Sequence, residues 1–158
     1  MSSIRRPSYF QPAAPERETV SVDLCVYGAT SGGIIAAIEA AERGLSVALL
    51  HPGLHIGGLT TGGLGMTDIG NKHAVGGKAR EFYERAGRHY GVDIEWRCEP
   101  HVASAIFAGW LKDAGVSPRL GQYVARCERR EGRIASLTTL SDLTVNAKVF
   151  IDASYEGD

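Results

Sequence analysis

The sequence contains no long hydrophobic run and no excess of charge of one sign. No apolar stretch approaches the roughly 20 residues that a membrane-spanning helix needs, so we expect no membrane segment. With 17 Lys and Arg against 18 Asp and Glu, the formal net charge is −1. A chain of this balance lacks the basic surface with which proteins bind nucleic acid, so we expect no nucleic-acid partner.

Cysteine is also scarce. Three cysteines (Cys25, Cys98 and Cys127) are odd in number and widely spaced, which argues against a disulfide framework. Cys25 lies in a predicted strand, where a free thiol behaves as a small hydrophobic side chain. Reduced cysteines, together with an incomplete signal sequence around Arg5-Arg6, predict a cytoplasmic protein.

One grouping, His89, Cys98 and His101, hints at metal binding. Its spacing matches no zinc pattern, and Trp96 and Pro100 break it up. We therefore expect no metal site.

Glycine, by contrast, is abundant, with 20 among 158 residues. Most glycines lie between Gly28 and Gly91, where the backbone must turn tightly or approach another group closely. Residues 1–20, rich in Ser, Pro and Arg, are predicted to form a flexible tail. Residues 21–158 are long enough to form one domain with a real core.

Residues 22–63 have the pattern of a strand, a tight turn, a helix and a second strand. The apolar run 22–27 ends at Gly28, apolar residues at helical spacing follow from 34 to 41, and a second apolar run spans 47–50. This order is the βαβ unit of a parallel α/β sheet.

The turn after the first strand has the sequence Gly28-Ala29-Thr30-Ser31-Gly32-Gly33. It is close to the dinucleotide fingerprint G-x-G-x-x-G, with Thr30 in place of the middle glycine. The middle position lets the backbone approach a pyrophosphate, so Thr30 must point away or donate its own hydrogen bond. A helix N-terminus behind the turn favours phosphate binding; a purely structural turn is the alternative.

Two other interpretations of this turn fail. A P-loop needs Lys followed by Ser or Thr after the last glycine, and Ile34-Ile35 stand there. A nucleophile elbow around Ser31 would have Ala29 in place of its first glycine.

His51 follows the second strand, where an acidic residue is expected to bind the adenosine ribose. An imidazole can still pair with a ribose hydroxyl, although it is a weaker acceptor than a carboxylate. The alternative is that His51 is simply the first residue of a loop.

A second glycine cluster lies in the long segment 52–71 and has the sequence Gly57-Gly58-Leu59-Thr60-Thr61-Gly62-Gly63. Its bare N–H groups and two hydroxyls suit an anion, a ribityl chain or the polar edge of a flavin ring; a flexible hinge is the alternative. We expect no regular element in 52–71, and we expect the two clusters to hold the two ends of one cofactor.

Further along, helical spacing predicts helices over 79–90 and 101–114. The expected inward face of the second helix is Val102, Ala105, Ile106, Trp110 and Leu111. Segments 122–127 and 134–140 predict a β-hairpin with a solvated arginine-rich tip, and a last strand is expected over 144–151.

The chain resembles the N-terminal part of FAD-dependent oxidoreductases with a glutathione-reductase-like FAD domain. The segments that carry the resemblance are VYGATSGGIIAAIEAAERG, HIGGLTTGGLGMTDIGNK, EPHVASAIFAGWL and IDASYEGD. The combination of the GG-x-T-T-G-G loop with the acidic terminus is specific, whereas the glycine turn alone is weak evidence.

The resemblance implies FAD as cofactor and assigns its contacts. The glycine turn would hold the pyrophosphate, His51 would replace the family's usual Glu at the ribose, and the loop from Gly57 to Gly63 would lie along the flavin. Val124 in the hairpin would border the adenine. The remaining contacts, near the ribityl chain or pyrophosphate, are Asp152, Gly157 and Asp158.

The resemblance also implies an incomplete FAD/NAD(P)-binding domain, with a Rossmann-like parallel sheet and a hairpin or meander insertion. A substrate domain and a C-terminal return would be absent, which would leave an exposed edge for a complementary polypeptide or for self-association. The expected function is hydride or electron-pair transfer between flavin and an unknown small molecule, with no catalytic residue assigned. The alternatives are a non-catalytic nucleotide-binding module, half of a split enzyme, or an NAD-dependent dehydrogenase domain.

Overall fold

The computed structural model describes residues 12–15 and 17–155, and this part of the chain forms a six-stranded sheet covered by helices. In chain order the elements are β1 (Thr19–Tyr27), α1 (Ser31–Glu42), β2 (Val47–His51), η1 (Gly58–Thr60), η2 (Lys72–Ala74), α2 (Gly77–Tyr90), α3 (Pro100–Asp113), β3 (Arg119–Leu120), β4 (Val124–Arg130), β5 (Arg133–Thr139) and β6 (Thr144–Asp152). The strand order is β3-β2-β1-β6-β5-β4. The first four of these strands are parallel, and β5 and β4 are added antiparallel.

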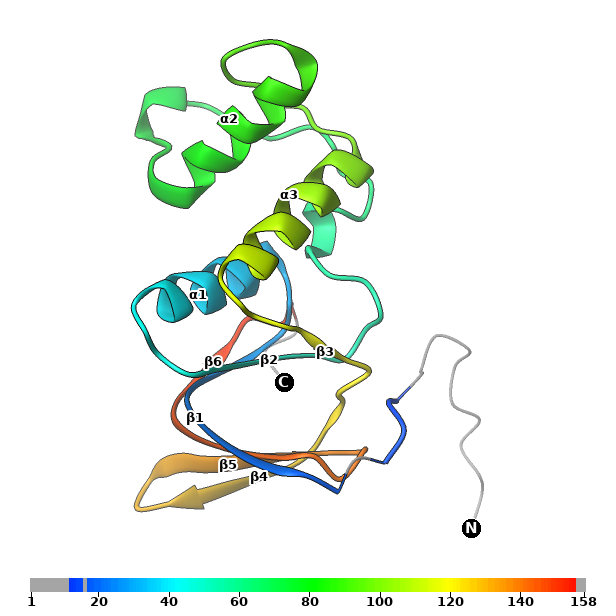
Figure 1. Ribbon diagram of the computed structural model, residues 1–158, viewed down its shortest axis with the longest axis vertical. Coiled ribbons are helices and arrows are strands. Elements are labelled where there is room, and N and C mark those ends of the chain that lie inside the picture. The colour runs from blue at the N-terminus through cyan, green and yellow to red at the C-terminus, as the bar shows by residue number, and fades with distance from the viewer. Residues whose placement is uncertain (1–11, 16, 156–158) are drawn as a thin grey trace.

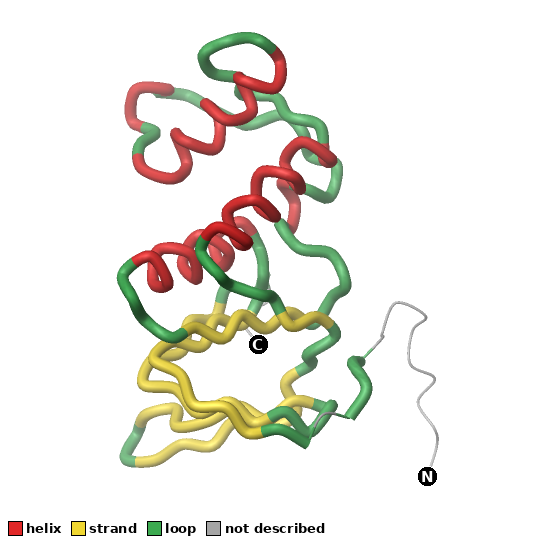
Figure 2. The backbone as a smooth tube through the Cα atoms, in the orientation of Figure 1, coloured by secondary structure: helices red, strands yellow, loops and turns green. Residues whose placement is uncertain are grey.

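This topology confirms the predicted α/β fold with a Rossmann-like parallel sheet and an added hairpin. α1 lies over one face of the sheet, α3 packs against α1, and α2 packs against α3 at the end of the molecule away from the sheet (Figures 1 and 2). The hairpin β4–β5 forms the opposite end of the molecule. Among the described residues, no helix has the length and hydrophobicity that a bilayer crossing would require.

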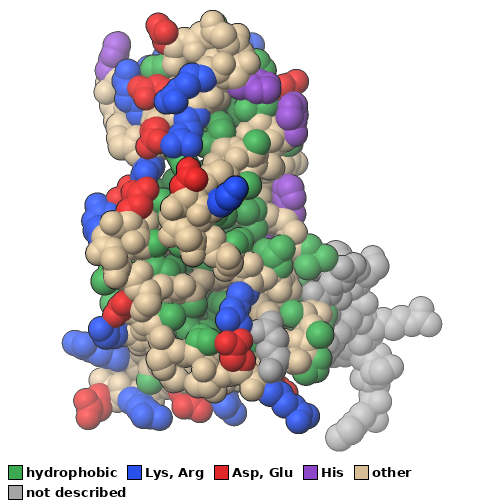
Figure 3. Space-filling model, in the orientation of Figure 1, with side chains coloured by type: hydrophobic (Ala, Val, Ile, Leu, Met, Phe, Trp, Pro, Cys, Tyr) green, Lys and Arg blue, Asp and Glu red, His purple; other side chains and the backbone are tan. Residues whose placement is uncertain are grey.

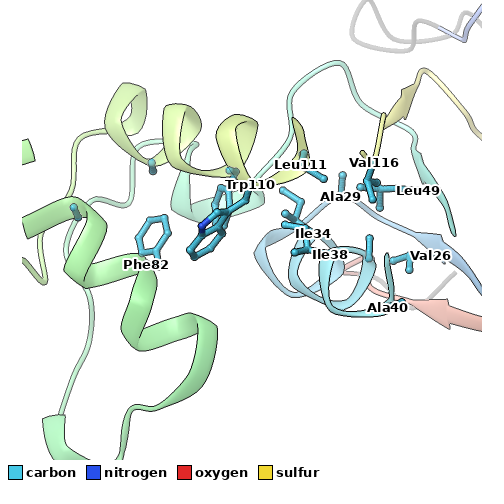
Figure 4. Packing of buried hydrophobic residues seen from close by; sticks show 14 of the residues in the cluster. Val26, Ala29, Ile34, Ile38, Ala40, Leu49, Phe82, Trp110, Leu111 and Val116 are labelled. Atoms are coloured by element: carbon cyan, nitrogen blue, oxygen red, sulfur yellow. The ribbon is translucent and has the colours of Figure 1, made fainter. Parts of the chain in front are cut away.

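Side chains alternate between the two faces of β1 and β2, as a pleated strand requires. Val26 and Leu49 point toward the helices, where they meet Ile34 and Ile38 of α1 (Figure 4). Cys25 points to the other face and is completely buried beneath the hairpin strands. Burial raises the pKa of the Cys25 thiol to about 12, so it is an inert hydrophobic group, as expected.

Some boundaries differ from the sequence prediction because long-range pairing sets them. β1 begins at Thr19, three residues before the predicted start, because Thr19 pairs with Thr144 of β6. β4 begins at Val124 rather than residue 122, and β3 was not predicted. The segment 52–71 contains one short 3₁₀ turn, η1.

The buried face of α3 also differs in part from the prediction. Ala105 is exposed, whereas Ala103 and Phe107 are buried together with Val102 and Trp110. This helix packs against both α1 and α2, so its buried stripe extends further around the helix than one interface would require. α3 begins at Pro100, one residue before the predicted start, at a position where proline is favoured.

The hairpin tip is charged and solvated, as the sequence indicated. β4 and β5 are joined by Glu131 and Gly132, which have φ angles of 50° and 79°, the left-handed pair of a tight two-residue turn. Basic and acidic side chains alternate over this end of the molecule (Figure 3). The exposed arginines are Arg126, Arg129, Arg130 and Arg133.

Candidate functional site

The turn between β1 and α1 packs so tightly that two of its positions accept only glycine. Gly28 has a φ angle of 102°, and a Cβ added to it would lie 2.6 Å from the carbonyl carbon of Ala153. A Cβ on Gly33 would lie 1.9 Å from the carbonyl oxygen of Gly28. Gly32 is different, because its nearest neighbour would be the Thr30 hydroxyl at 3.9 Å.

Thr30, at the middle glycine position of the fingerprint, caps α1. Its Oγ1 accepts a hydrogen bond from the N–H of Gly33 at 3.3 Å and donates one to the carbonyl oxygen of Ala153 at 2.9 Å. The side chain therefore links the first turn of α1 to the segment that follows β6. The N–H groups of Ser31 and Gly32 have no acceptor within the helix, and Gly32 is exposed. This helix end is suited to an anion.

His51 connects the end of β2 to the glycine turn. Its Nδ1 accepts a hydrogen bond from the N–H of Ala29 at 3.1 Å, and its Nε2 lies 2.9 Å from the carbonyl oxygen of His55. These partners require the neutral tautomer with its hydrogen on Nε2, and burial lowers the pKa of His51. Both ring nitrogens are thus engaged within the protein, and a bond to ribose would replace one of these contacts.

This arrangement predicts a loss of stability at acidic pH. The pKa of His51 in the folded state lies below the unfolded value of about 6.5, so its contribution is complete above that value and is lost as the pH falls through the folded pKa. As the pH is lowered from about 7.5 to 5, we expect the free energy of unfolding measured in urea to fall less steeply for His51→Asn than for the wild type. The exposed His73→Asn should keep the wild-type dependence; identical profiles for all three proteins would contradict this role of His51.

The second glycine cluster is attached directly to the first. The N–H of Gly57 donates to the carbonyl oxygen of Ala29 at 2.7 Å, and Gly57 forms a parallel bridge with Thr30. The φ angles of Gly57 and Gly58 are 95° and 58°, in the left-handed region that glycine enters without strain. The two clusters are therefore adjacent in the structure.

The side chains of the second cluster have different environments. Thr61 is buried, and its hydroxyl donates to the carbonyl oxygen of Ile56, so it holds the loop together. Thr60 is half-buried and lines a cavity, whereas Leu59 is exposed. Of the two threonines that the sequence offered to a cofactor, Thr60 lines the cavity, whereas the hydroxyl of Thr61 is bonded within the loop.

The two clusters open onto one cavity with a volume of about 330 Å³. Ser31 and Gly32 of α1 lie on one side of it, Thr60 on another, and the aromatic rings of α2 and α3 complete the wall. A neighbouring cavity of about 180 Å³ also borders Thr60. The wall aromatics are Phe82, Tyr83 and Phe107. They were not predicted as site residues, since helical spacing indicated only that these residues lie in helices.

The segment after β6 closes the site from the other side. Asp152 Oδ1 accepts the N–H of Ser154 at 2.8 Å, and the Tyr155 hydroxyl accepts the N–H of Leu59 at 2.7 Å. Tyr155 belongs to the terminal motif IDASYEGD but was not predicted to contact the cofactor. The structure places it beside the second glycine cluster. Gly157 and Asp158, both predicted cofactor contacts, lie outside the described residues.

Val124, the predicted neighbour of adenine, begins β4 and packs against the apolar cluster beneath the sheet. The segment just before it reaches the end of β2, because the N–H of Gln122 donates to the carbonyl oxygen of His51 at 2.9 Å. Val124 therefore lies in a segment attached to the glycine turn through His51.

Solved structures with a similar fold include a deaminase, monooxygenases and reductases. The L-amino acid deaminase from Proteus vulgaris matches with 17% identity over 90% of this chain and 50% of that chain, at a TM-score of 0.58. The closed structure of cyclohexanone monooxygenase matches with 18% identity over 86% of this chain and 26% of that one, at 0.62. T. acidophilum thioredoxin reductase matches with 24% identity over 87% and 35%, at 0.51.

At these identities the likeness shows the fold alone, and the chain spans between about a quarter and a half of each matched protein's length. A comparison with curated protein sequences gave no match. A family model, described as FAD dependent oxidoreductase, matches residues 23–158. That range includes the glycine turn, the second glycine cluster and the end of β6. The chain therefore belongs to the FAD dependent oxidoreductase family, whose cofactor is FAD.

Proposed function

We propose that this chain is the FAD-binding portion of an oxidoreductase that exchanges a hydride or an electron pair between a small molecule and the flavin. The observation that carries the proposal is the hydrogen bond between Gly57 and Ala29, which joins the two glycine clusters beside one shared cavity. FAD has an anionic pyrophosphate and a flat ring at one end, and the cavity has a helix N-terminus and an aromatic wall.

The residues present fit these two parts of FAD. The free N–H groups of Ser31 and Gly32 and the positive end of α1 suit the pyrophosphate. Thr60 and the rings of Phe82 and Tyr83 offer a hydroxyl and flat apolar surface. When bound, FAD supplies the redox chemistry, and the chain binds and orients it.

A substitution at Gly32 tests the pyrophosphate site without damaging the fold. Because a Cβ at this position meets only the Thr30 hydroxyl at 3.9 Å, Gly32→Asp should fold, and a negative charge in the first turn favours the helix. The same charge repels a pyrophosphate, so we expect FAD affinity to fall at least tenfold, about 1.4 kcal/mol. Calorimetric titration of the purified chain with FAD measures this.

Gly32→Asn is the matched neutral control and should bind FAD more tightly than Gly32→Asp. Equal affinity of the two variants would contradict a pyrophosphate at the N-terminus of α1. A chain that binds NAD but not FAD would overturn the proposed function as a whole.

A further inference from the structure

Two histidines and one glutamate come together where α2 ends and α3 begins, outside the FAD site. His89 is in the last turn of α2, Glu99 is the N-cap of α3, and His101 is in the first turn of α3. Their potential ligand atoms all lie within 4.8 Å of one another, and all three residues are exposed. Histidine side chains are visible on the surface of this helical end (Figure 3). We propose that this cluster binds a divalent first-row transition metal ion, with Zn²⁺ as the best fit.

The donor set suits this class of ion. Two imidazole nitrogens and one carboxylate form a three-ligand zinc site that keeps a further position for water. Mg²⁺ and Ca²⁺ prefer oxygen ligands and are disfavoured by the two histidines. Metal–nitrogen bonds of about 2.0–2.1 Å in a tetrahedron place ligand atoms roughly 3.4 Å apart. A separation of up to 4.8 Å therefore has to shrink by about 1.4 Å, which exposed side chains can provide by changing rotamer.

Tyr90 already orients the glutamate. Its hydroxyl donates to Glu99 Oε2 at 2.8 Å and accepts the N–H of Glu99 at 3.1 Å. One carboxylate oxygen is thereby held, and Oε1 is left to face an ion. Hydrogen bonds of this kind from groups behind the ligands orient metal ligands and raise affinity.

The surrounding charges are compatible with a bound cation. Arg85 lines the same groove as His89 and His101, but its guanidinium is paired with Glu81 at 2.9 Å. Glu81 thus offsets part of the positive charge of Arg85, and the carboxylate of Glu99 adds a negative charge at the cluster itself.

Cys98, which the sequence had grouped with the two histidines, is not part of this site. Its side chain is buried, its thiol donates to the carbonyl oxygen of Glu99 at 3.5 Å, and burial raises the pKa of the thiol. Glu99, the next residue, provides the third ligand in its place. The Cys98 backbone N–H donates to Gly65 at 3.0 Å, just beyond the second glycine cluster.

The test is a calorimetric titration of the tag-free, EDTA-treated chain with Zn²⁺. We expect one ion per chain, loss of that ion in both His89→Ala and His101→Ala, and retention in the control His73→Ala. Tyr90→Phe, which keeps all three ligands, should weaken binding about tenfold or more. Cys98→Ala should bind as the wild type does.

The fold of each variant is checked by circular dichroism before titration. Failure of the wild-type chain to bind Zn²⁺, Co²⁺ or Ni²⁺ would overturn the proposal. So would unchanged Zn²⁺ binding in folded His89→Ala and His101→Ala, since the ion would then be held elsewhere. A rise in melting temperature with Zn²⁺ that is lost in His101→Ala would support it, because the ion would join α2 to α3.

Discussion

Gly33→Ala is expected to lose most of its folded stability, whereas Gly32→Ala, one residue earlier, should be at least as stable as the wild type. The methyl carbon added at position 33 would lie 1.9 Å from the carbonyl oxygen of Gly28 and 3.0 Å from the Cβ of Ala153. Both neighbours are fixed by the sheet, so the clash is relieved only by separating α1 from β1. We expect a loss of about 3 kcal/mol or more, a large part of the roughly 5–15 kcal/mol typical of a domain.

Gly32→Ala provides the matched control, because both substitutions add one methyl group to the same turn. Position 32 has space for the methyl, and alanine favours a helix over glycine by about 0.5–1 kcal/mol. Urea unfolding followed by far-UV circular dichroism measures both variants. Stabilities within about 1 kcal/mol of each other would contradict the packing described for Gly33.

Trp110→Ala is expected to destabilise the protein by about 3–5 kcal/mol. Trp110 of α3 is 3% exposed and packs against Phe82 of α2 and Phe107, at ring distances of 6.3 Å and 6.2 Å (Figure 4). Lys78 and Arg85 lie over its ring, at 5.5 Å and 5.0 Å from the centroid. Removing the indole therefore leaves a cavity and two cations without their aromatic partner.

Trp110→Phe separates packing from hydrogen bonding. The indole Nε1 is buried and has no hydrogen-bond partner among the described residues. Phenylalanine removes this unsatisfied donor, whose burial costs about 1–3 kcal/mol. This gain offsets part of the stability lost with the smaller side chain. Thermal unfolding should place Trp110→Phe much closer to the wild type than to Trp110→Ala. Equal losses in the two variants would show that the indole N–H is satisfied after all.

The sequence predicted the helices and strands that are determined by residues close together in the chain. The apolar run before Gly28, the helical spacing after it and the second apolar run predict β1, α1 and β2, with the end of β1 and the start of β2 at the observed residues. Pro100 marks the start of α3 for an equally local reason. The first residues of β1 were missed because they depend on β6, 125 positions away in the register of Thr19 with Thr144.

The sequence also predicted only those features of the candidate site that depend on local sequence. Glycine spacing was enough to identify both clusters, but it contained no information on which threonine faces the cavity. Thr61 is turned inward by the carbonyl oxygen of Ile56, and Thr60 is not. Similarly, the sequence left the His51 ring available to a ribose. In the structure, backbone groups of Ala29 and His55 occupy its two ring nitrogens. Such contacts depend on tertiary placement, which no residue pattern encodes.

The hydrogen bond from Thr30 to Ala153 has a consequence for biosynthesis. The turn between β1 and α1 is synthesised well before its packing partner, because Ala153, whose carbonyl oxygen accepts the Thr30 hydroxyl and which packs on Gly28, follows Thr30 by 123 residues. At about 5–20 residues per second, that separation is roughly 6–25 s of synthesis. During this interval the N-terminal end of α1 lacks the strand that supports it, so the turn reaches its final packing only after β6 has been synthesised.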